Sequence, residues 1–174
     1  MLAIRSFPLA AVALLALAPL ALAPRALAQE VPSLLPSDSR PAGLVLLQQR
    51  PVLGGTQTIG VYGAEADRLE PGLWRIKVWD ELPDDVKVRS ETIRCGTAAP
   101  MRVTSDGRVL IVRELNPGGA INPSNRLDHL IWWATCFPQR AGQDPAGLGA
   151  EARRLGYSGH LVEQEQRLPL AGRR

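Results

Sequence analysis

The first 28 residues constrain the rest of the chain most, because they have the three parts of a secretory signal peptide. Arg5 supplies a basic start, and residues 7–23 contain no charge and consist mostly of Ala, Leu and Val. Small residues follow in an Ala-x-Ala exit that ends at Ala28. Secretion machinery and its peptidase recognise these three features. We therefore expect cleavage after Ala28 and a mature protein that is periplasmic or secreted.

An uncleaved membrane anchor is the alternative to a leader. The apolar run is shorter than the roughly 20 residues that a spanning helix needs, and Pro8 and Pro19 interrupt it. An earlier Ala-x-Ala at residues 21–23 also fits, but it would place Pro24 directly after the cut, where proline obstructs the peptidase. The mature part has no second apolar segment long enough to span a bilayer, so we expect no transmembrane segment there.

Removal of the leader also changes the charge of the protein. The full chain has 20 Lys and Arg against 17 Asp and Glu, and only Arg5 and Arg25 leave with the leader. The mature chain therefore has 18 basic against 17 acidic residues. Such a balance lacks the strong basic field that is typical of nucleic-acid-binding domains, so we expect no nucleic-acid partner.

Two cysteines, Cys95 and Cys136, lie in the mature part. An even number of cysteines in an oxidising compartment favours a disulfide, although two buried thiols or a metal pair are alternatives. In most protein metal sites, the cysteine and histidine ligands lie a few positions apart. Neither cysteine has a histidine that close. We predict a Cys95–Cys136 disulfide and no metal site.

The mature part predicts a mainly β fold, with residues 42–160 forming a single antiparallel β-sandwich or partly open barrel. The pattern is clearest at residues 73–79, where Trp74, Ile76 and Val78 alternate with basic residues. Further strands are predicted at residues 44–49, 56–62 and 86–95, the last with a bulge near Ser90-Glu91 where the apolar positions change parity.

A hairpin is predicted at residues 101–112. Asp106-Gly107 suits a two-residue type I′ turn, which would pair Val103 with Leu110. Residues 109–112 are apolar on both faces, which favours a strand inside the sheet. Residues 128–136 are also apolar on alternate positions of both faces and are predicted to form another strand.

Three flanking segments differ from the strands. Residues 29–41 are rich in proline and serine and predict a disordered lead-in. Asp144 is a good N-cap with proline after it, and Gly156 is a natural stop, so residues 144–156 predict one short helix. Residues 161–174 predict a polar tail.

Catalytic patterns are weak. A Ser-His-Asp site needs a positioned base, and the chain has two histidines, His129 and His160. The sequence Gly156–His160 resembles a nucleophile elbow, but His160 takes the place of the last glycine. The chain has no phosphate-binding glycine motif and no Cys-x-x-Cys pair, so we predict no catalytic residue and no cofactor.

Four residues are candidates for a binding surface. On their predicted strands, Trp79 and Trp133 lie on the faces opposite to Trp74 and Trp132, which have apolar neighbours. Trp79 and Trp133 could therefore form an exposed aromatic platform. A second covered face of the sheet is the alternative. Asn116 and Asn122 lie in the loop 116–125, which has the length of a binding loop.

One resemblance adds to this picture. Glu70–Trp74, Cys95 and the later Trp133–Cys136 resemble a group of small secreted bacterial proteins of unknown function. These proteins have a Pro-Gly-Leu-Trp strand start and a later Trp-x-x-Cys strand. The resemblance implies an antiparallel β fold in the periplasm and implies no activity.

Together these features predict a non-catalytic periplasmic or secreted envelope protein that binds a partner protein, a glycan or a small apolar ligand. A small periplasmic hydrolase that uses His129 or His160 is one alternative, and a structural or assembly factor of the envelope is the other.

Overall fold

A computed structural model of the chain describes residues 36–170, so the predicted leader and most of the lead-in lie outside the described residues. Seven antiparallel strands form one sheet in which each strand pairs with the next along the chain. The prediction of a mainly β, antiparallel fold is confirmed, as one sheet that does not close. The strands are β1 (Val45–Val52), β2 (Gly55–Ala66), β3 (Leu73–Glu81), β4 (Val86–Arg94), β5 (Met101–Ser105), β6 (Val109–Glu114) and β7 (Gln164–Pro169).

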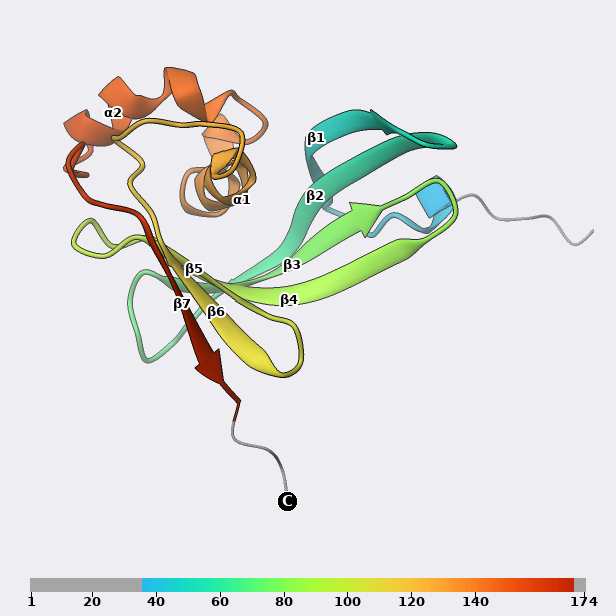
Figure 1. The fold of residues 1–174 in the computed structure, drawn as a ribbon, viewed down its shortest axis with the longest axis horizontal. Helices are drawn as coiled ribbons and strands as arrows, with labels where there is room; N and C mark the ends of the chain where they lie inside the picture. The colour runs from blue at the N-terminus through green and yellow to red at the C-terminus, as the bar shows by residue number, and fades with distance from the viewer. Residues whose placement is uncertain (1–35, 171–174) are drawn as a thin grey trace, which may run out of the picture. The chain divides into compact units, whose positions relative to one another are not determined.

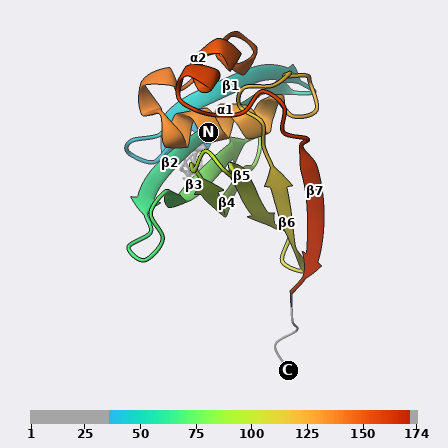
Figure 2. The same cartoon turned by 90° about the vertical axis from the view of Figure 1, so that its left-hand side faces the viewer.

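Two helices follow β6 and lie on one face of this sheet, which we call the inner face (Figure 1). They are α1 (Arg126–Cys136) and the shorter α2 (Gly149–Arg154). The sheet curls, so that the hairpin of β1 and β2 lies on one side of α1 and strands β5 to β7 lie on the other. Turned by 90°, the ribbon shows β7 as the free edge of the sheet, away from the helices (Figure 2).

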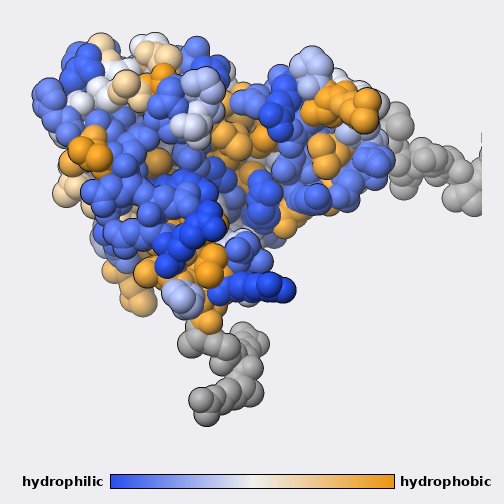
Figure 3. All heavy atoms as spheres, viewed as in Figure 1, coloured by the Kyte–Doolittle hydropathy of each residue, from blue (hydrophilic) through white to orange (hydrophobic). Residues whose placement is uncertain are grey.

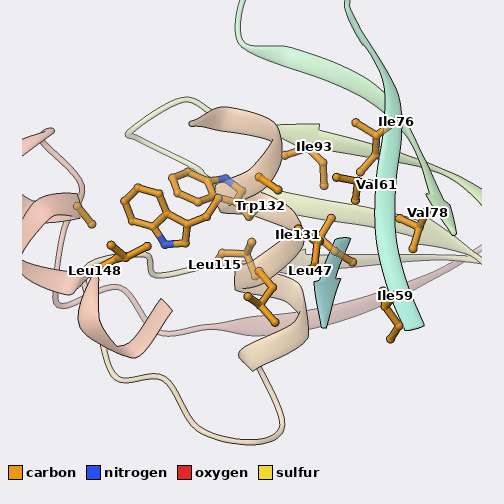
Figure 4. Close-up of a cluster of buried hydrophobic side chains, with 14 of the residues drawn as sticks. Leu47, Ile59, Val61, Ile76, Val78, Ile93, Leu115, Ile131, Trp132 and Leu148 are labelled. Atoms are coloured by element: carbon orange, nitrogen blue, oxygen red, sulfur yellow. The ribbon is translucent and has the colours of Figure 1, made fainter. Parts of the chain in front are cut away.

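The core lies between α1 and the first four strands. Alternation along β2 and β3 points Ile59, Val61, Ile76 and Val78 toward the helix, where Ile131 meets them (Figure 4). Burying a side chain of this size stabilises the folded state by about 1.5–3 kcal/mol. The apolar half of the inner face is therefore covered by the helix.

The predicted strand at residues 128–136 is wrong, because this segment is helix α1. Its residues 128–135 are all buried, since the sheet covers one side of the helix and later segments cover the other. A helix that is buried all round has no polar face, so it lacks the period that would distinguish it from a buried strand. Trp132 is fully buried, as expected of a core residue.

The predicted disulfide is present between Cys95, directly after β4, and Cys136, the last residue of α1. Their Cα atoms lie 5.5 Å apart. The bond therefore ties a helix, rather than a second strand, to the sheet. Two hydrogen bonds reinforce the same junction: Trp132 Nε1 donates to the Arg94 carbonyl at 3.0 Å and the Tyr157 hydroxyl donates to the Cys95 carbonyl at 2.6 Å.

The hairpin of β5 and β6 is confirmed, but its register differs from the prediction by two residues. Val103 pairs with Val112 instead of Leu110. Gly107 alone has positive φ in this turn, so the type I′ geometry is not formed. Asp106 Oδ1 instead accepts from the amides of Arg108 and Val109, both at 2.8 Å, and this side-chain bond stabilises a longer turn. β6 lies between two strands, as its apolar pattern predicts.

The predicted bulge near Ser90-Glu91 is wrong, since β4 pairs with β3 in one unbroken register. The apolar positions change parity for another reason. Val88 lies on the outer face, whereas Ile93 is buried on the inner face. Glu91 shares that inner face and is also buried, so a charged residue occupies a position where the pattern would place an apolar one.

The outer face is partly covered by the segment that precedes β1. Arg40 donates to both carboxylate oxygens of Glu81 at 2.7 Å, and Trp79 Nε1 donates to Glu81 Oε2 at 2.9 Å. A Cβ at Gly60, the cross-strand partner of Trp79, would lie 2.8 Å from Leu44 Cδ1. The end of the predicted lead-in is therefore packed on the sheet.

The remaining predictions concern the C-terminal part. The predicted helix at residues 144–156 forms as two pieces, a 3-10 turn from Pro145 to Gly147 and α2. Asp144 caps the first piece by accepting from the Ala146 amide. The predicted polar tail includes strand β7, which pairs along its length with β6. In the described part of the chain, no helix is long and apolar enough to cross a membrane.

Candidate functional site

Charged and amide side chains form a ladder across the inner face of the sheet, beside the apolar area that α1 covers. Arg50 Nε on β1 donates to Gln57 Oε1, and Gln57 Nε2 donates to Asp80 Oδ1, both at 2.5 Å. Arg89 on β4 lies 3.5 Å from Asp80 Oδ2 and 3.7 Å from Glu91 Oε1. The strand register places these residues on one face, because side chains alternate along each strand.

Arg102 on β5 is the centre of this ladder. Its Nε and Nη2 donate to the two oxygens of Glu91 at 2.7 and 2.8 Å, and its Nη1 donates to Asp128 Oδ1. The side chains of Arg102 and Glu91 are only 6% and 1% exposed. Burial alone would lower the pKa of Arg102, but the bonds and charges of Glu91 and Asp128 outweigh burial and raise it. All three nitrogens of this guanidinium are therefore occupied.

Arg89 and Arg113 lie on either side of Arg102, on β4 and β6, and their donors are less occupied. Arg89 makes only the two long contacts to Asp80 and Glu91 among the described residues, and its side chain is 40% exposed. Arg113 Nε lies 3.0 Å from Glu165 Oε2, and its Nη1 donates to Thr104 Oγ1 at 3.3 Å. A guanidinium has five N–H donors, so both arginines keep donors that no protein acceptor uses.

A groove of about 440 Å³ lies over this part of the sheet, between strands β4 to β7 and the start of α1. Its lining includes Arg89, Arg102, Thr104, Arg113, Asp128 and Glu165. In the space-filling view, strongly hydrophilic side chains gather over strands β5 to β7 (Figure 3). The fold therefore leaves a groove on the inner face beside α1, and charged side chains line it.

A second polar cluster holds the segment before β7 against α1. His129 is fully buried, and its Nε2 lies 2.6 Å from Glu163 Oε1. Burial alone would raise the pKa of Glu163, but hydrogen bonds from His129, Asn125 and the Asn116 amide outweigh burial and lower it. Glu163 is thus held in its carboxylate form by three donors, and it connects helix, loop and strand.

The predicted aromatic platform is wrong, because neither tryptophan is exposed. Trp79 is 5% exposed and packs edge-on against Tyr62 on the outer face. Trp133 is 1% exposed and lies in α1 against Trp132 and Phe137. On a strand Trp133 would lie on the face opposite to Trp132, whereas on the buried helix α1 both Trp132 and Trp133 enter the core.

The two candidate asparagines of the loop 116–125 form hydrogen bonds within the protein. Asn116 is buried, and its Nδ2 donates to the Leu161 carbonyl at 2.8 Å. Asn122 Oδ1 accepts from the amide of Ser124 at 2.9 Å, just before α1 begins. The loop is therefore a connector shaped by side-chain bonds, and its residue Ser124 also lines the groove.

Sequence reasoning missed the groove, although its residues carry a signal. Arg102, Thr104 and Arg113 alternate with apolar residues on the two strands of the predicted hairpin. Such alternation predicts one solvated face, and it does not indicate that this face turns inward beside a helix. The buried partner Glu91 interrupts the apolar pattern of β4, and from the sequence alone such an interruption indicates a bulge.

A comparison of the chain with protein-family models, with curated proteins and with solved structures finds no significant match.

Proposed function

We propose that this protein is a non-catalytic binding protein of the periplasm or the extracellular space, and that the charged groove is its ligand site. The leader pattern at residues 1–28 supports export. The disulfide between Cys95 and Cys136 is consistent with an oxidising compartment.

One observation carries the proposal of a ligand site. A buried arginine with all its nitrogens occupied is flanked by two arginines that have unused donors and line an open groove of about 440 Å³. Binding sites combine a concave shape with a few polar groups that are fixed by their surroundings. Charged lining favours a polar small molecule or a glycan over the apolar ligand that the sequence also allowed, because burying these charges against an apolar ligand would be costly.

The arrangement of the two histidines favours this proposal over a hydrolase. His129 is fully buried, and its Nε2 is taken by Glu163, which leaves it no access to a substrate. His160 is exposed, and its backbone amide donates to the hydroxyl of Ser158. A general base needs hydrogen-bond reach to the proton that it takes, and a nucleophile beside it.

Native mass spectrometry of the full chain tests the proposal, after incubation with a polar extract of bacterial envelopes. We expect a bound small molecule that adds a discrete mass to the protein. Thr104→Trp places a large side chain in the groove and should abolish this added mass. Gln166→Trp is the matched control, because Gln166 lies on the outer face of β7 and should leave the added mass unchanged.

The proposal fails if the wild-type chain retains no small molecule. It also fails if Thr104→Trp, folded as judged by circular dichroism, retains as much of it as the wild type. A protein that crosslinks to one stoichiometric partner in intact cells and binds no small molecule would favour an assembly factor.

A further inference from the structure

We propose that the groove takes the anionic group of its ligand, a carboxylate or a phosphate, between Arg89 and Arg113. This inference rests on the proposed function, because it names the chemical class of ligand for the same site. It follows from the hydrogen-bond donors and acceptors that the protein leaves unused.

Net charge does not select the ligand. The groove is lined by Arg89, Arg102 and Arg113 and by four carboxylates, from Glu91, Asp106, Asp128 and Glu165. A nearly balanced lining gives no strong field of either sign. Selection must therefore come from directional contacts.

Three of the four carboxylates of the groove lie against arginines, and Asp106 accepts from backbone amides. Both oxygens of Glu91 accept from Arg102, and Asp128 lies against Arg102 and, at 3.8 Å, against Arg113 Nε. The two oxygens of Glu165 lie 3.0 Å from Arg113 Nε and 2.9 Å from Arg167 Nε. The acidic side chains thus act inside the protein and offer a ligand few free acceptors.

Arg89 and Arg113, in contrast, have hydrogen-bond donors without protein acceptors. Arg89 has no partner closer than 3.5 Å among the described residues, although its side chain is 40% exposed beside the groove. Arg113 commits Nε and Nη1 and is 27% exposed. The groove therefore has more unused hydrogen-bond donors than unused acceptors. A ligand rich in acceptor atoms would bind to these donors. Planar guanidinium groups bind carboxylate and phosphate oxygens in pairs, which makes these anions the best match.

The position of the two arginines fits one anionic group held from both sides. They are on β4 and β6, with β5 between them. Arg113 pairs with Arg102, whereas Arg89 is four residues along β4 from Ile93, the other partner of Arg102, so their backbones are about 16 Å apart. Thr104 on β5 lies between them and presents a hydroxyl toward Arg113. The charge of Arg102 is neutralised by Glu91 and Asp128. Arg102 therefore forms the base of the site and does not compete with Arg89 and Arg113 for the ligand.

Titration of the full chain, followed by NMR of the arginine Nε–H groups, tests this inference. The probes are inorganic phosphate, sodium acetate, sodium chloride at matched ionic strength and the neutral sugar trehalose. We expect saturable shifts of Arg89 and Arg113 with phosphate or acetate, and the probe with the higher affinity identifies the anionic group. An equal response to chloride, a response to trehalose instead, or no response would overturn the inference.

Single substitutions sharpen the test. Arg89→Gln and Arg113→Gln should each weaken binding of the preferred anion at least about tenfold, because each removes a charge-assisted contact. Arg113→Lys keeps the charge but loses the paired donors and should also weaken binding. Arg75→Gln removes a 71% exposed arginine from the outer face and should change nothing. Equal loss in Arg75→Gln would indicate general screening and contradict the site.

The two proposals fail separately. A neutral ligand that Thr104→Trp excludes and that Arg89→Gln retains would contradict the anion inference and leave the binding function in place. Absence of any retained small molecule in native mass spectrometry would contradict the binding function itself, whatever the anion titration gives.

Discussion

Arg102→Met is expected to destabilise the folded protein by about 3–5 kcal/mol, because it leaves two carboxylates without their buried partner. Glu91 is 1% exposed and Asp128 is 13% exposed, so both carboxylates depend on this guanidinium for most of their compensation. Domains of this size have a total stability of about 5–15 kcal/mol, so a loss of this size is large. Urea unfolding followed by circular dichroism measures it.

A triple variant separates the loss of a partner from the loss of packing. Replacing Arg102, Glu91 and Asp128 together by apolar residues should restore most of the stability, because no buried charge is then left unpaired. Arg75→Met, at a 71% exposed position, should change the free energy of unfolding by no more than about 0.5 kcal/mol. A triple variant as unstable as Arg102→Met would mean that the network does not act through its buried charges.

Reduction of the Cys95–Cys136 bond is expected to destabilise the protein by about 4 kcal/mol in the chain-entropy model, because the bond closes a loop of 41 residues. The bond also holds the end of α1 on the sheet, beside the contacts of Trp132 and Tyr157. The urea midpoint should therefore fall when a reductant is added. The double variant Cys95→Ala/Cys136→Ala should show the lower midpoint without reductant.

The double variant also supplies the control, since reductant should not change its midpoint further. A wild-type midpoint that is the same with and without reductant would contradict a stabilising role for the bond.

The strands and the disulfide could be predicted because their signals are local. Trp74, Ile76 and Val78 alternate along β3, and this period defines a half-buried strand whatever lies beyond it. The disulfide follows from two cysteines and a predicted leader. These predictions depend on a few residues each.

The helix α1 and the strand β7 could not be predicted because neighbours determine them. Helix α1 is buried on every side, and its apolar residues fit a strand as well as a helix. The reason differs for β7. Every residue of this strand is exposed, and no alternation of apolar residues indicates a strand. Its backbone pairing with β6 makes it a strand, and that pairing is a long-range property.

The candidate site was predicted in the wrong place for a related reason. Tryptophan is common in binding sites, but Trp133 lies in the core because its segment is a helix. The charged residues of the groove alternate with apolar ones, which by itself indicates only a half-buried strand. Their arrangement around Arg102 depends on Asp128, which only the helix brings to the sheet.

The division of donors among the three arginines of the groove is tested most directly by exchange of their Nε–H protons with water, measured by NMR on the full chain. The Arg102 proton is bonded to buried Glu91 and should exchange at least about tenfold more slowly than the Arg89 proton, which has only long contacts. Adding the preferred anion should then slow exchange at Arg89 and Arg113 and leave Arg102 unchanged. Equal exchange rates at Arg89 and Arg102 in the absence of ligand would contradict the proposed site.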